Sequence, residues 1–251
     1  MYDIISLLIN NNCMANCKFC IAKHQNFPQT HFTDKFKSFT KTKLITLLSL
    51  GNNYNCKNFS ISGLKGDPLN FEYLTDVLEL SKNIFKNKIS IHTNGLLLDK
   101  YNVDYFSDIG LTISLYSFND KINKDIMQTN ISNNIIIDFI NKYLNKFNAN
   151  NIKLSKVITI NDTRQDIINY LNDCINIGIN RVVLRLDYNN KNIELNINEL
   201  YKINKIYNNS IYNYKNKIEV TVWNYHNSTL KGLYLYPDGI IRDKYIYKKE
   251  S

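Results

Sequence analysis

Short apolar runs alternate with amphipathic stretches along most of this 251-residue chain. The runs expected as strands are Ile4–Asn10, Asn58–Ser62, Lys88–Thr93, Leu111–Leu115, Ile152–Ile160 and Arg181–Leu186. The stretches between them expected as helices are Thr40–Gly51, Phe71–Phe85, Tyr101–Ile109, Ile131–Phe147 and Arg164–Ile177. Strands that alternate with helices form a parallel sheet with the helices outside, which we expect to curve into a partial or full barrel.

Right-handed crossovers place the carboxyl ends of such strands on one side, where the catalytic loops of barrels gather. Three of the five cysteines follow the first strand at C-x3-C-x2-C spacing: Cys13, Cys17 and Cys20. Thiolates are the usual ligands of iron–sulfur clusters. Structural zinc takes four ligands in paired knuckles, and a disulfide would leave an odd thiol. Three thiolates on a four-iron cluster leave one iron without a protein ligand, as a catalytic site requires.

These three cysteines, with the aromatic Phe19 just before the third, resemble the signature of the radical S-adenosylmethionine (radical SAM) superfamily. The resemblance covers roughly residues 4–186. It implies an α/β fold, a partial (β/α)6 parallel barrel of radical SAM type, with residues 1–190 as its core. It also implies one [4Fe-4S] cluster on the three cysteines, SAM bound to the open iron, and a one-electron donor of the flavodoxin or ferredoxin type.

Further motifs carry the same resemblance. The turn of Gly66, Asp67 and Pro68 is similar to the family's GGEP motif, which contacts the SAM amino group. It differs in that Lys65 stands where the first glycine is usual and Asp67 replaces glutamate. Thr93-Asn94-Gly95 matches the family's TNG ending of strand three, which places Asn94 among the SAM-binding residues. The other positions that the resemblance assigns to SAM are Phe19, Ser114, Ser117, Asn161 and the backbone around Leu186.

After the sixth strand the pattern changes. A helix is expected near Glu199–Tyr207 and a strand at Ile218–Trp223. Two aromatic strands, Gly232–Tyr236 and Ile240–Tyr247, flank the turn Pro237-Asp238-Gly239. Residues 191–251 are thus expected to form a C-terminal helix and a small β-hairpin cap in the same globular unit. We expect the hairpin to pack across the barrel's open side and shelter the reaction from solvent; the alternative is that it extends the sheet at an edge.

No catalytic residue is assigned beyond three candidates. Cys56 and Cys174 lie among apolar neighbours and are expected as buried small hydrophobes, with hydrogen-atom donation as the alternative. His226 is a candidate substrate contact, as are Asp187 and Tyr188 just past the sixth strand. No cysteine follows Cys174, so no auxiliary cluster is expected.

The formal net charge of +9 suits an acidic partner, but the lysines are scattered and do not interleave with aromatics, so nucleic acid is not expected. No apolar run reaches membrane-spanning length and no signal peptide opens the chain, which predicts a reducing cytoplasm and no membrane partner.

The fourth-strand and TNG segments are most similar to the molybdenum-cofactor cyclase and peptide-maturase branch of the superfamily. That resemblance favours a peptide or protein side chain as substrate, with a nucleotide-like small molecule as the alternative. A separate N-terminal peptide-recognition domain is not expected, which weighs against the peptide. A non-enzymatic iron–sulfur or zinc-binding module would explain the cysteines but not the ordered barrel motifs.

Overall fold

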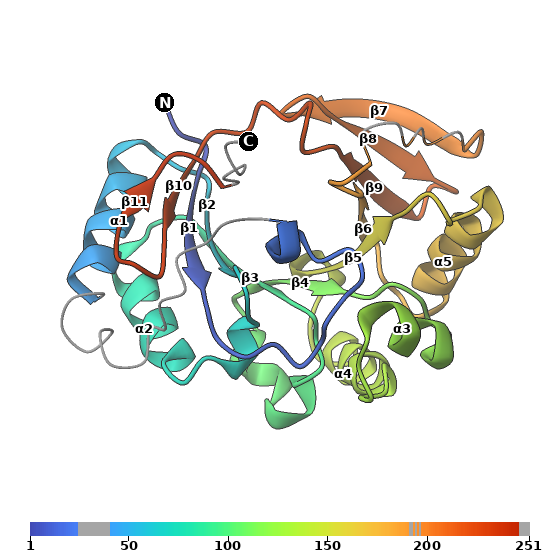
Figure 1. The fold of residues 1–251 in the computed structure, drawn as a ribbon, viewed down its shortest axis with the longest axis horizontal. Coiled ribbons are helices and arrows are strands. Elements are labelled where there is room, and N and C mark those ends of the chain that lie inside the picture. The colour runs from blue at the N-terminus through green and yellow to red at the C-terminus, as the bar shows by residue number, and fades with distance from the viewer. Residues whose placement is uncertain (25–40, 191–192, 194, 196, 246–251) are drawn as a thin grey trace. The chain divides into compact units, whose positions relative to one another are not determined.

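The computed structural model describes residues 1–24, 41–190, 193, 195 and 197–245 (Figure 1). The chain divides into two compact units. The first unit comprises Met1–Met14, Cys20–Thr93 and Leu230–Ser251, and the second comprises Ala15–Phe19 and Asn94–Thr229. The C-terminal residues after position 190 are therefore shared between the two units, and the expected domain boundary there remains a prediction.

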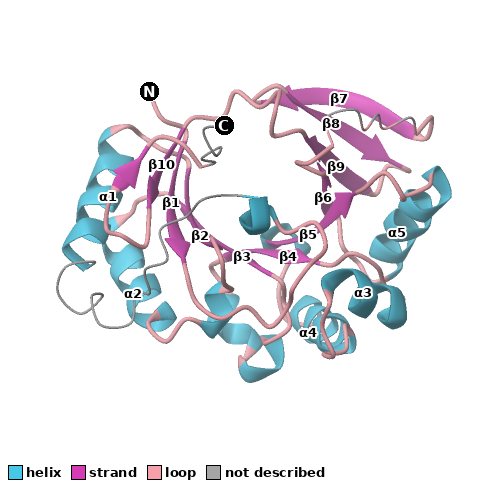
Figure 2. Cartoon of the chain, in the orientation of Figure 1, coloured by secondary structure: helices cyan, strands magenta, loops and turns pink. Residues whose placement is uncertain are grey.

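The first unit contains a sheet with the strand order β11-β10-β1-β2-β3. Its strands are β1 (Ile4–Ile9), β2 (Asn58–Gly63), β3 (Lys88–Thr93), β10 (Gly232–Leu235) and β11 (Ile241–Arg242). All neighbours are parallel except β10 and β11. Helices α1 (Lys41–Asn53) and α2 (Leu74–Ile84) lie on one side of this sheet (Figure 2). The buried positions of α2, Leu74, Val77, Leu78 and Ser81, recur at helical spacing and make the packed face.

The two faces of this first sheet differ in chemistry. A Cβ atom on Gly51 of α1 would lie 2.5 Å from the Ile5 side chain, so Ile5 faces the helices. On the opposite face Ser6, Ser60 and Ser90 stand in register across three strands. The Ser60 hydroxyl donates to Ser6 Oγ at 2.9 Å, and Ser6 Oγ donates to the Ser60 carbonyl at 3.0 Å. The face away from the helices is therefore lined by hydroxyl groups.

The second unit contains a sheet with the order β4-β5-β6-β9-β8-β7. Its strands are β4 (Gly110–Ser114), β5 (Ile152–Ile158), β6 (Arg181–Leu186), β7 (Leu200–Ile206), β8 (Asn209–Tyr214) and β9 (Ile218–Trp223). Strands β4, β5, β6 and β9 run parallel, whereas β8 and β7 are antiparallel additions. Helices α3 (Asp120–Met127), α4 (Asn134–Leu144) and α5 (Arg164–Asn176) lie on one side of the parallel strands (Figure 2).

Short 3-10 turns complete the secondary structure. They span Ile21–His24, Pro68–Asn70, Leu98–Lys100, Val103–Phe106 and Ala149–Asn151. The helix expected at Tyr101–Ile109 is reduced to one of these turns. All six strands predicted for the barrel are present, with ends that differ by a few residues.

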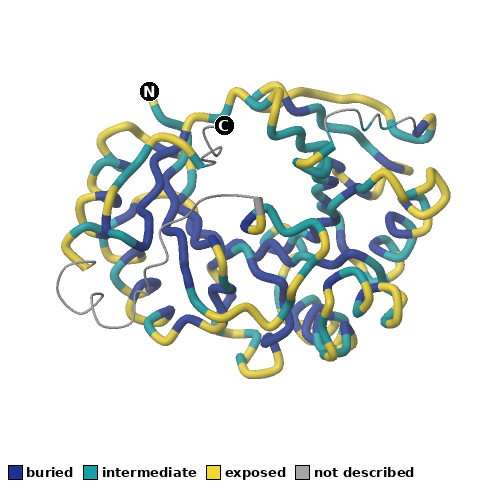
Figure 3. The backbone as a smooth tube through the Cα atoms, in the orientation of Figure 1, coloured by how far each residue is buried: buried dark blue, intermediate teal, exposed yellow. Residues whose placement is uncertain are grey.

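The helix expected near Glu199–Tyr207 is wrong, because Leu200–Ile206 is strand β7. Tyr207 and Asn208 have φ values of 50° and 61°, which make a two-residue hairpin turn into β8. Pairing with β8 thus decides the conformation, since β-propensity depends on the neighbouring strand. Figure 3 shows that β7 is exposed along most of its length.

The C-terminal hairpin forms as predicted, but its expected place over the barrel is wrong. Strand β10 pairs parallel with β1, from Ile4 opposite Gly232 to Leu7 opposite Leu235. Strand β11 pairs antiparallel with β10. The hairpin therefore extends the sheet at its edge, where it satisfies the backbone groups of β1 that an open edge would leave unpaired. Residues 246 and 247 of the expected second strand lie outside the described residues. Among the described helices, none has the length and apolar character needed to cross a membrane.

Candidate active site

The cysteine loop follows β1 and carries three thiols within eight residues. Cys13 is exposed, Cys17 and Cys20 are half-buried, and no disulfide forms among the described cysteines. Cys13 and Cys20 belong to the first unit and Cys17 to the second. In the described part of the chain, no three His, Cys, Asp or Glu side chains are grouped to hold a metal ion. The donor set nevertheless fits an iron–sulfur cluster, because three accessible thiols at short spacing are the soft ligands that such a cluster takes.

In the first unit, the start of this loop is bound to the turn of Gly66, Asp67 and Pro68. Asn11 Nδ2 donates to the Asp67 carbonyl at 3.1 Å, and the Asp67 amide donates to Asn11 Oδ1 at 2.9 Å. A Cβ atom on Gly66 would lie 1.8 Å from Asn11 Oδ1 and 2.6 Å from the Asn11 amide nitrogen. Gly66 is therefore required by this close approach. The turn that the sequence assigns to SAM is thus fixed to the residues leading into Cys13.

The buried Asp67 carboxylate also stabilises this turn. Asp67 is 3% exposed, and Thr93 Oγ1 lies 2.7 and 2.9 Å from its two carboxylate oxygens. The Leu69 amide donates to Asp67 Oδ1 at 2.9 Å, so Asp67 caps the 3-10 turn that Pro68 begins. The structure gives a physical reason for aspartate here. Its short side chain folds the turn and ties it to the end of β3.

In the second unit, Ala15–Phe19 packs against the end of α3. The amides of Asn16 and Lys18 donate to the carbonyls of Met127 and Ile126 at 2.9 and 3.1 Å. Lys18 also forms an exposed ion pair with Asp125 at 3.0 Å. These contacts fix the backbone on both sides of Cys17.

Phe19 stacks on Tyr116, with ring centroids 5.8 Å apart and planes at 23°. Tyr116 lies two residues after the end of β4. Its ring sets the position of the aromatic residue that precedes the third cysteine.

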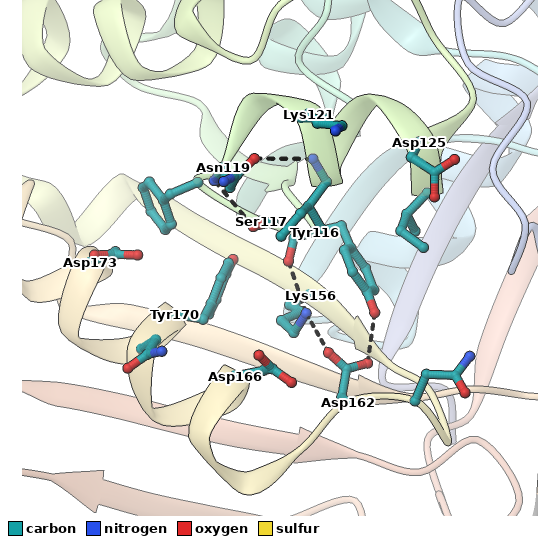
Figure 4. A pocket seen from close by; sticks show the side chains of 15 residues that line it. Tyr116, Ser117, Asn119, Lys121, Asp125, Lys156, Asp162, Asp166, Tyr170 and Asp173 are labelled. Carbon is teal, nitrogen blue, oxygen red and sulfur yellow. Dashed lines mark hydrogen bonds and ion pairs between the residues drawn. The ribbon is translucent and has the colours of Figure 1, made fainter.

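A buried ion pair lies beneath Tyr116 (Figure 4). Lys156 Nζ lies 2.7 Å from Asp162 Oδ1, and the two side chains are 3% and 2% exposed. Lys156 Nζ also donates to the Tyr116 carbonyl at 2.9 Å and lies 3.5 Å from the Tyr116 ring centroid. The Tyr116 hydroxyl donates to Asp162 Oδ2 at 2.9 Å, and the Thr159 amide donates to the same oxygen at 2.8 Å.

This network joins the loops that follow β4 and β5. Burial lowers the pKa of Lys156, and the neighbouring Asp162 carboxylate opposes that shift. Burial raises the pKa of Tyr116 to about 12, so its hydroxyl remains a hydrogen-bond donor. Each charge has a partner with good geometry, which a buried pair needs in order to be tolerated.

A cavity of about 660 Å³ opens beside this network, between α3 and α5. Of the residues predicted to bind SAM, Ser117 and Asn161 line it, together with Asp125, Asp166 and Asp173. Ser114 is not among its lining residues. It pairs with Ser155 on the sheet face opposite to Lys156. The structure therefore does not bring Ser114 together with Ser117 and Asn161.

The remaining cofactor candidates lie at strand ends. Asn94 is 9% exposed, and its Oδ1 accepts from the Leu96 amide at 3.0 Å. Gly95 next to it has a φ of 76°, which favours glycine in this turn. Leu186 ends β6 and is half-buried.

The three catalytic candidates have different surroundings. Cys56 and Cys174 are both 0% exposed, and burial raises the pKa of each thiol. They are core residues, as expected, and burial gives neither thiol the access to substrate that a hydrogen-atom donor needs. His226 is exposed and stacks on Tyr188 at 4.8 Å, with Nε2 3.0 Å from the Tyr188 carbonyl.

The sequence did not identify Lys156 and Asp162 as a pair. Thr163 caps α5 and forms a capping box with Asp166, whereas the Asp162 carboxylate pairs with Lys156. One signal was available: Lys156 interrupts the apolar alternation of Ile152, Leu154 and Ile158. A charged residue on the buried face of a strand requires a partner.

The fold and the cysteine loop together define a class, namely α/β proteins with mostly parallel strands that carry three cysteines after the first strand. The family model of the Radical SAM superfamily matches residues 7–174, and the chain belongs to this superfamily. The cofactors of the superfamily are a [4Fe-4S] cluster and SAM.

Two curated proteins illustrate the similarity. A "Probable GTP 3′,8-cyclase" from Methanococcus aeolicus is 29% identical over 133 residues, which cover 51% of this chain and 42% of the relative. The "Dual-specificity RNA methyltransferase RlmN" from Buchnera aphidicola is 28% identical over 145 residues, with 55% and 40% covered. The chain thus spans less than half the length of the curated relatives it matches.

Solved structures share the fold. Streptococcus suis SuiB bound to precursor peptide SuiA gives a TM-score of 0.60 at 19% identity, covering 74% of this chain and 39% of SuiB. The protein anSMEcpe with bound AdoMet gives 0.53 at 14% identity, covering 82% of this chain and 55% of that chain. At these identities the likeness supports the open, mostly parallel α/β fold.

Proposed function

We propose that this chain is a radical SAM enzyme in which Cys13, Cys17 and Cys20 hold one [4Fe-4S] cluster. The observation that carries the proposal is the three accessible thiols directly after β1 in a chain of this family. A cluster held there and reduced by a flavodoxin- or ferredoxin-type donor would supply the electron for reductive cleavage of SAM to methionine and the 5′-deoxyadenosyl radical that would abstract a substrate hydrogen atom.

The protein's own residues position the reactants. The Gly66–Pro68 turn offers backbone groups to the SAM amino group, and its shape depends on Asn11 and Asp67. Phe19, held by Tyr116, and the strand-end residues Asn94, Ser114 and Leu186 are the proposed further contacts of SAM. Ser117 and Asn161 line the cavity between α3 and α5 and are not proposed to join them. The barrel orients the cofactor and excludes water from it.

The test is reductive SAM cleavage. Anaerobically reconstituted protein with dithionite should release 5′-deoxyadenosine from SAM, slowly and even without substrate. Cys17→Ala should lose this activity, whereas Met14→Ala, a change at an exposed residue of the same loop, should retain it. Reduced protein that holds a metal but neither binds nor cleaves SAM would favour a non-enzymatic module, iron–sulfur or zinc-binding according to the metal found.

For the substrate we propose a peptide or protein side chain. The sequence motifs resemble those of the molybdenum-cofactor cyclase and peptide-maturase branch, and the SuiB neighbour was solved with a precursor peptide. The second candidate is a nucleotide-like small molecule, which the similarity to a probable GTP 3′,8-cyclase favours. Incubation with candidate peptides or nucleotides, followed by mass spectrometry of the products, distinguishes the two.

A further inference from the structure

Arginine is rare in this chain, and one arginine differs from the others. Lysine and arginine together number 31, of which four are arginine. Three of these form ion pairs: Arg164 with Glu199, Arg181 with Glu219, and Arg242 with Asp238. Arg185 is half-buried, and its guanidinium makes no hydrogen bond or ion pair with any described residue. A guanidinium that is partly withdrawn from water and has no ion pair within the described residues is available to pair with an anion.

The strand register places Arg185 on the open face of the second unit's sheet. Its parallel partners are Val157 on β5 and Trp223 on β9, so these side chains share a face. The neighbouring positions Val182 and Leu184 point the other way and are buried. Leu184 pairs with Lys156, which lines the cavity together with residues of α5, so this is the face that the helices cover. Arg185 therefore points away from the helices, near the carboxyl end of β6. Active-site groups of parallel barrels gather at such strand ends.

Aromatic side chains lie at the ends of β6 and of the neighbouring strand β9. Tyr188 follows β6, and Trp223, Tyr225 and His226 lie at the end of β9. Tyr225 makes edge contacts with Tyr188 and Trp223, both with centroids 6.3 Å apart. The stack of Tyr188 on His226 completes the group. We call Tyr188, Trp223, Tyr225 and His226 the aromatic cluster. Through Trp223, which the strand register places next to Arg185, the cluster offers a partly apolar surface near that residue.

We propose that Arg185 binds a side-chain carboxylate of an acidic peptide substrate, with the neighbouring peptide residues against the aromatic cluster. This inference rests on the proposed function and names the substrate class of that enzyme. A guanidinium matches a carboxylate with two parallel hydrogen bonds. A single arginine balances one carboxylate, whereas a triphosphate carries several charges and needs several cations. The net charge of +9 also attracts an acidic peptide.

The chain contains its own reporter of this site. Trp223 is the single tryptophan and neighbours Arg185 across the strand pair. Reconstituted protein with SAM is titrated with a short blocked peptide that has a central glutamate, with the same peptide carrying glutamine, and with GTP. We expect a saturable change in tryptophan fluorescence with the glutamate peptide and none with the glutamine peptide.

Arg185→Met should weaken binding of the glutamate peptide about tenfold or more, the usual effect of losing a charged hydrogen-bonded pair. Arg181→Met is the matched control, because Arg181 lies on the same strand face but is ion-paired with Glu219; it should bind as the wild type does. Iron content and SAM affinity should be unchanged in Arg185→Met. If wild type and Arg185→Met respond alike, or if Arg185→Met loses SAM binding instead, the proposal is wrong.

The remaining outcomes are equally decisive. A fluorescence response that depends on Arg185 and occurs with GTP but not with the glutamate peptide would contradict the proposal. It would indicate that Arg185 binds a phosphate group. A wild-type protein that binds the glutamate peptide through Arg185 but cleaves no SAM would support this site, while the proposed function would fail separately.

Discussion

The Lys156–Asp162 pair links the segment after β4 to the segment after β5, and Phe19 rests on the same network through Tyr116. A buried charge that loses its partner is far more costly than the intact pair is favourable. Replacing one partner of this pair should therefore destabilise the fold strongly.

Lys156→Met should lower the free energy of unfolding by about 3–5 kcal/mol, because Asp162 would remain buried without its cation. Urea unfolding followed by circular dichroism measures the change. The double variant Lys156→Met with Asp162→Asn should recover part of the loss, since it removes both charges. A single variant within about 1 kcal/mol of the wild type would contradict the buried pair.

Gly66→Ala should disturb the turn assigned to SAM, because its Cβ would overlap Asn11 Oδ1 at 1.8 Å and the Asn11 backbone at 2.6 Å. Relieving this overlap should cost about 1–3 kcal/mol of stability and weaken SAM binding. Equilibrium dialysis with SAM and urea unfolding are the measurements. Lys65→Ala, at an exposed neighbour, is the control and should leave both unchanged. Normal SAM affinity in Gly66→Ala would separate this turn from the SAM site.

At single positions, the sequence predicted which residues are buried better than it predicted which side chains contact one another. The burial of Cys56 and Cys174 followed from their apolar neighbours. The Lys156–Asp162 ion pair could not be predicted from the sequence. Lys156 lies on β5 and Asp162 in the loop after it, and only the fold shows which face of β5 is covered. The ion pairs that single out Arg185 are likewise visible only in three dimensions.

Among the elements, α5 has the most complete start. Thr163 Oγ1 accepts from the Asp166 amide, and the Asp166 carboxylate accepts from the Thr163 amide at 2.9 Å. Hydrogen bonds from the Thr163 side chain and backbone hold the pKa of Asp166 below its ordinary value. Folding therefore favours the ionised carboxylate.

Thr163→Ala should lower the free energy of unfolding at neutral pH by about 1 kcal/mol. Because the folded-state pKa of Asp166 is lowered, its contribution is complete above the unfolded value of about 3.9 and disappears as pH falls through the folded value. The difference between wild type and variant should shrink below about pH 4, and urea unfolding at several pH values tests this. A difference that stays constant into acid would exclude this role for Asp166.

The C-terminal hairpin should be needed for folding and should not act as a lid. Ending the chain near Asn227 removes β10, which leaves β1 without its edge partner and deletes the buried side chains of Leu233, Leu235 and Tyr236. We expect the truncated protein to lose cooperative unfolding and to aggregate. Ile240→Ser, at an exposed turn residue, should fold normally. A truncated protein that keeps its cluster and SAM binding, but releases 5′-deoxyadenosine without converting substrate, would support the hypothesis that the hairpin is a lid.

Element type was predictable wherever a local pattern was strong. The six predicted parallel strands follow from the hydrophobic periodicity of the sequence. Strand β7 was missed because its pairing with β8 determines its conformation. The residues of β7 themselves carry no local pattern that indicates a strand. The position of β10 beside β1 was equally invisible, since the two strands are separated by most of the chain.

For the whole molecule, the family follows from the order of the motifs, whereas the substrate does not. Cluster and SAM motifs recur across the superfamily, so they identify the cofactors. The surface that selects a substrate is built from side chains such as Arg185 and Trp223, which the register of β6 and β9 brings together. Their pairing cannot be inferred before the strand order is known.

The most direct test of the central claim is electron paramagnetic resonance of the reduced, reconstituted protein with and without SAM. If Cys13, Cys17 and Cys20 hold one cluster with an open iron, the wild type should contain about four irons per chain, and its spectrum should change when SAM is added. Cys17→Ala should lose the signal, while Met14→Ala should retain both the signal and its response to SAM. A cluster signal that persists in Cys17→Ala, or a wild-type signal that SAM leaves unchanged, would contradict the claim.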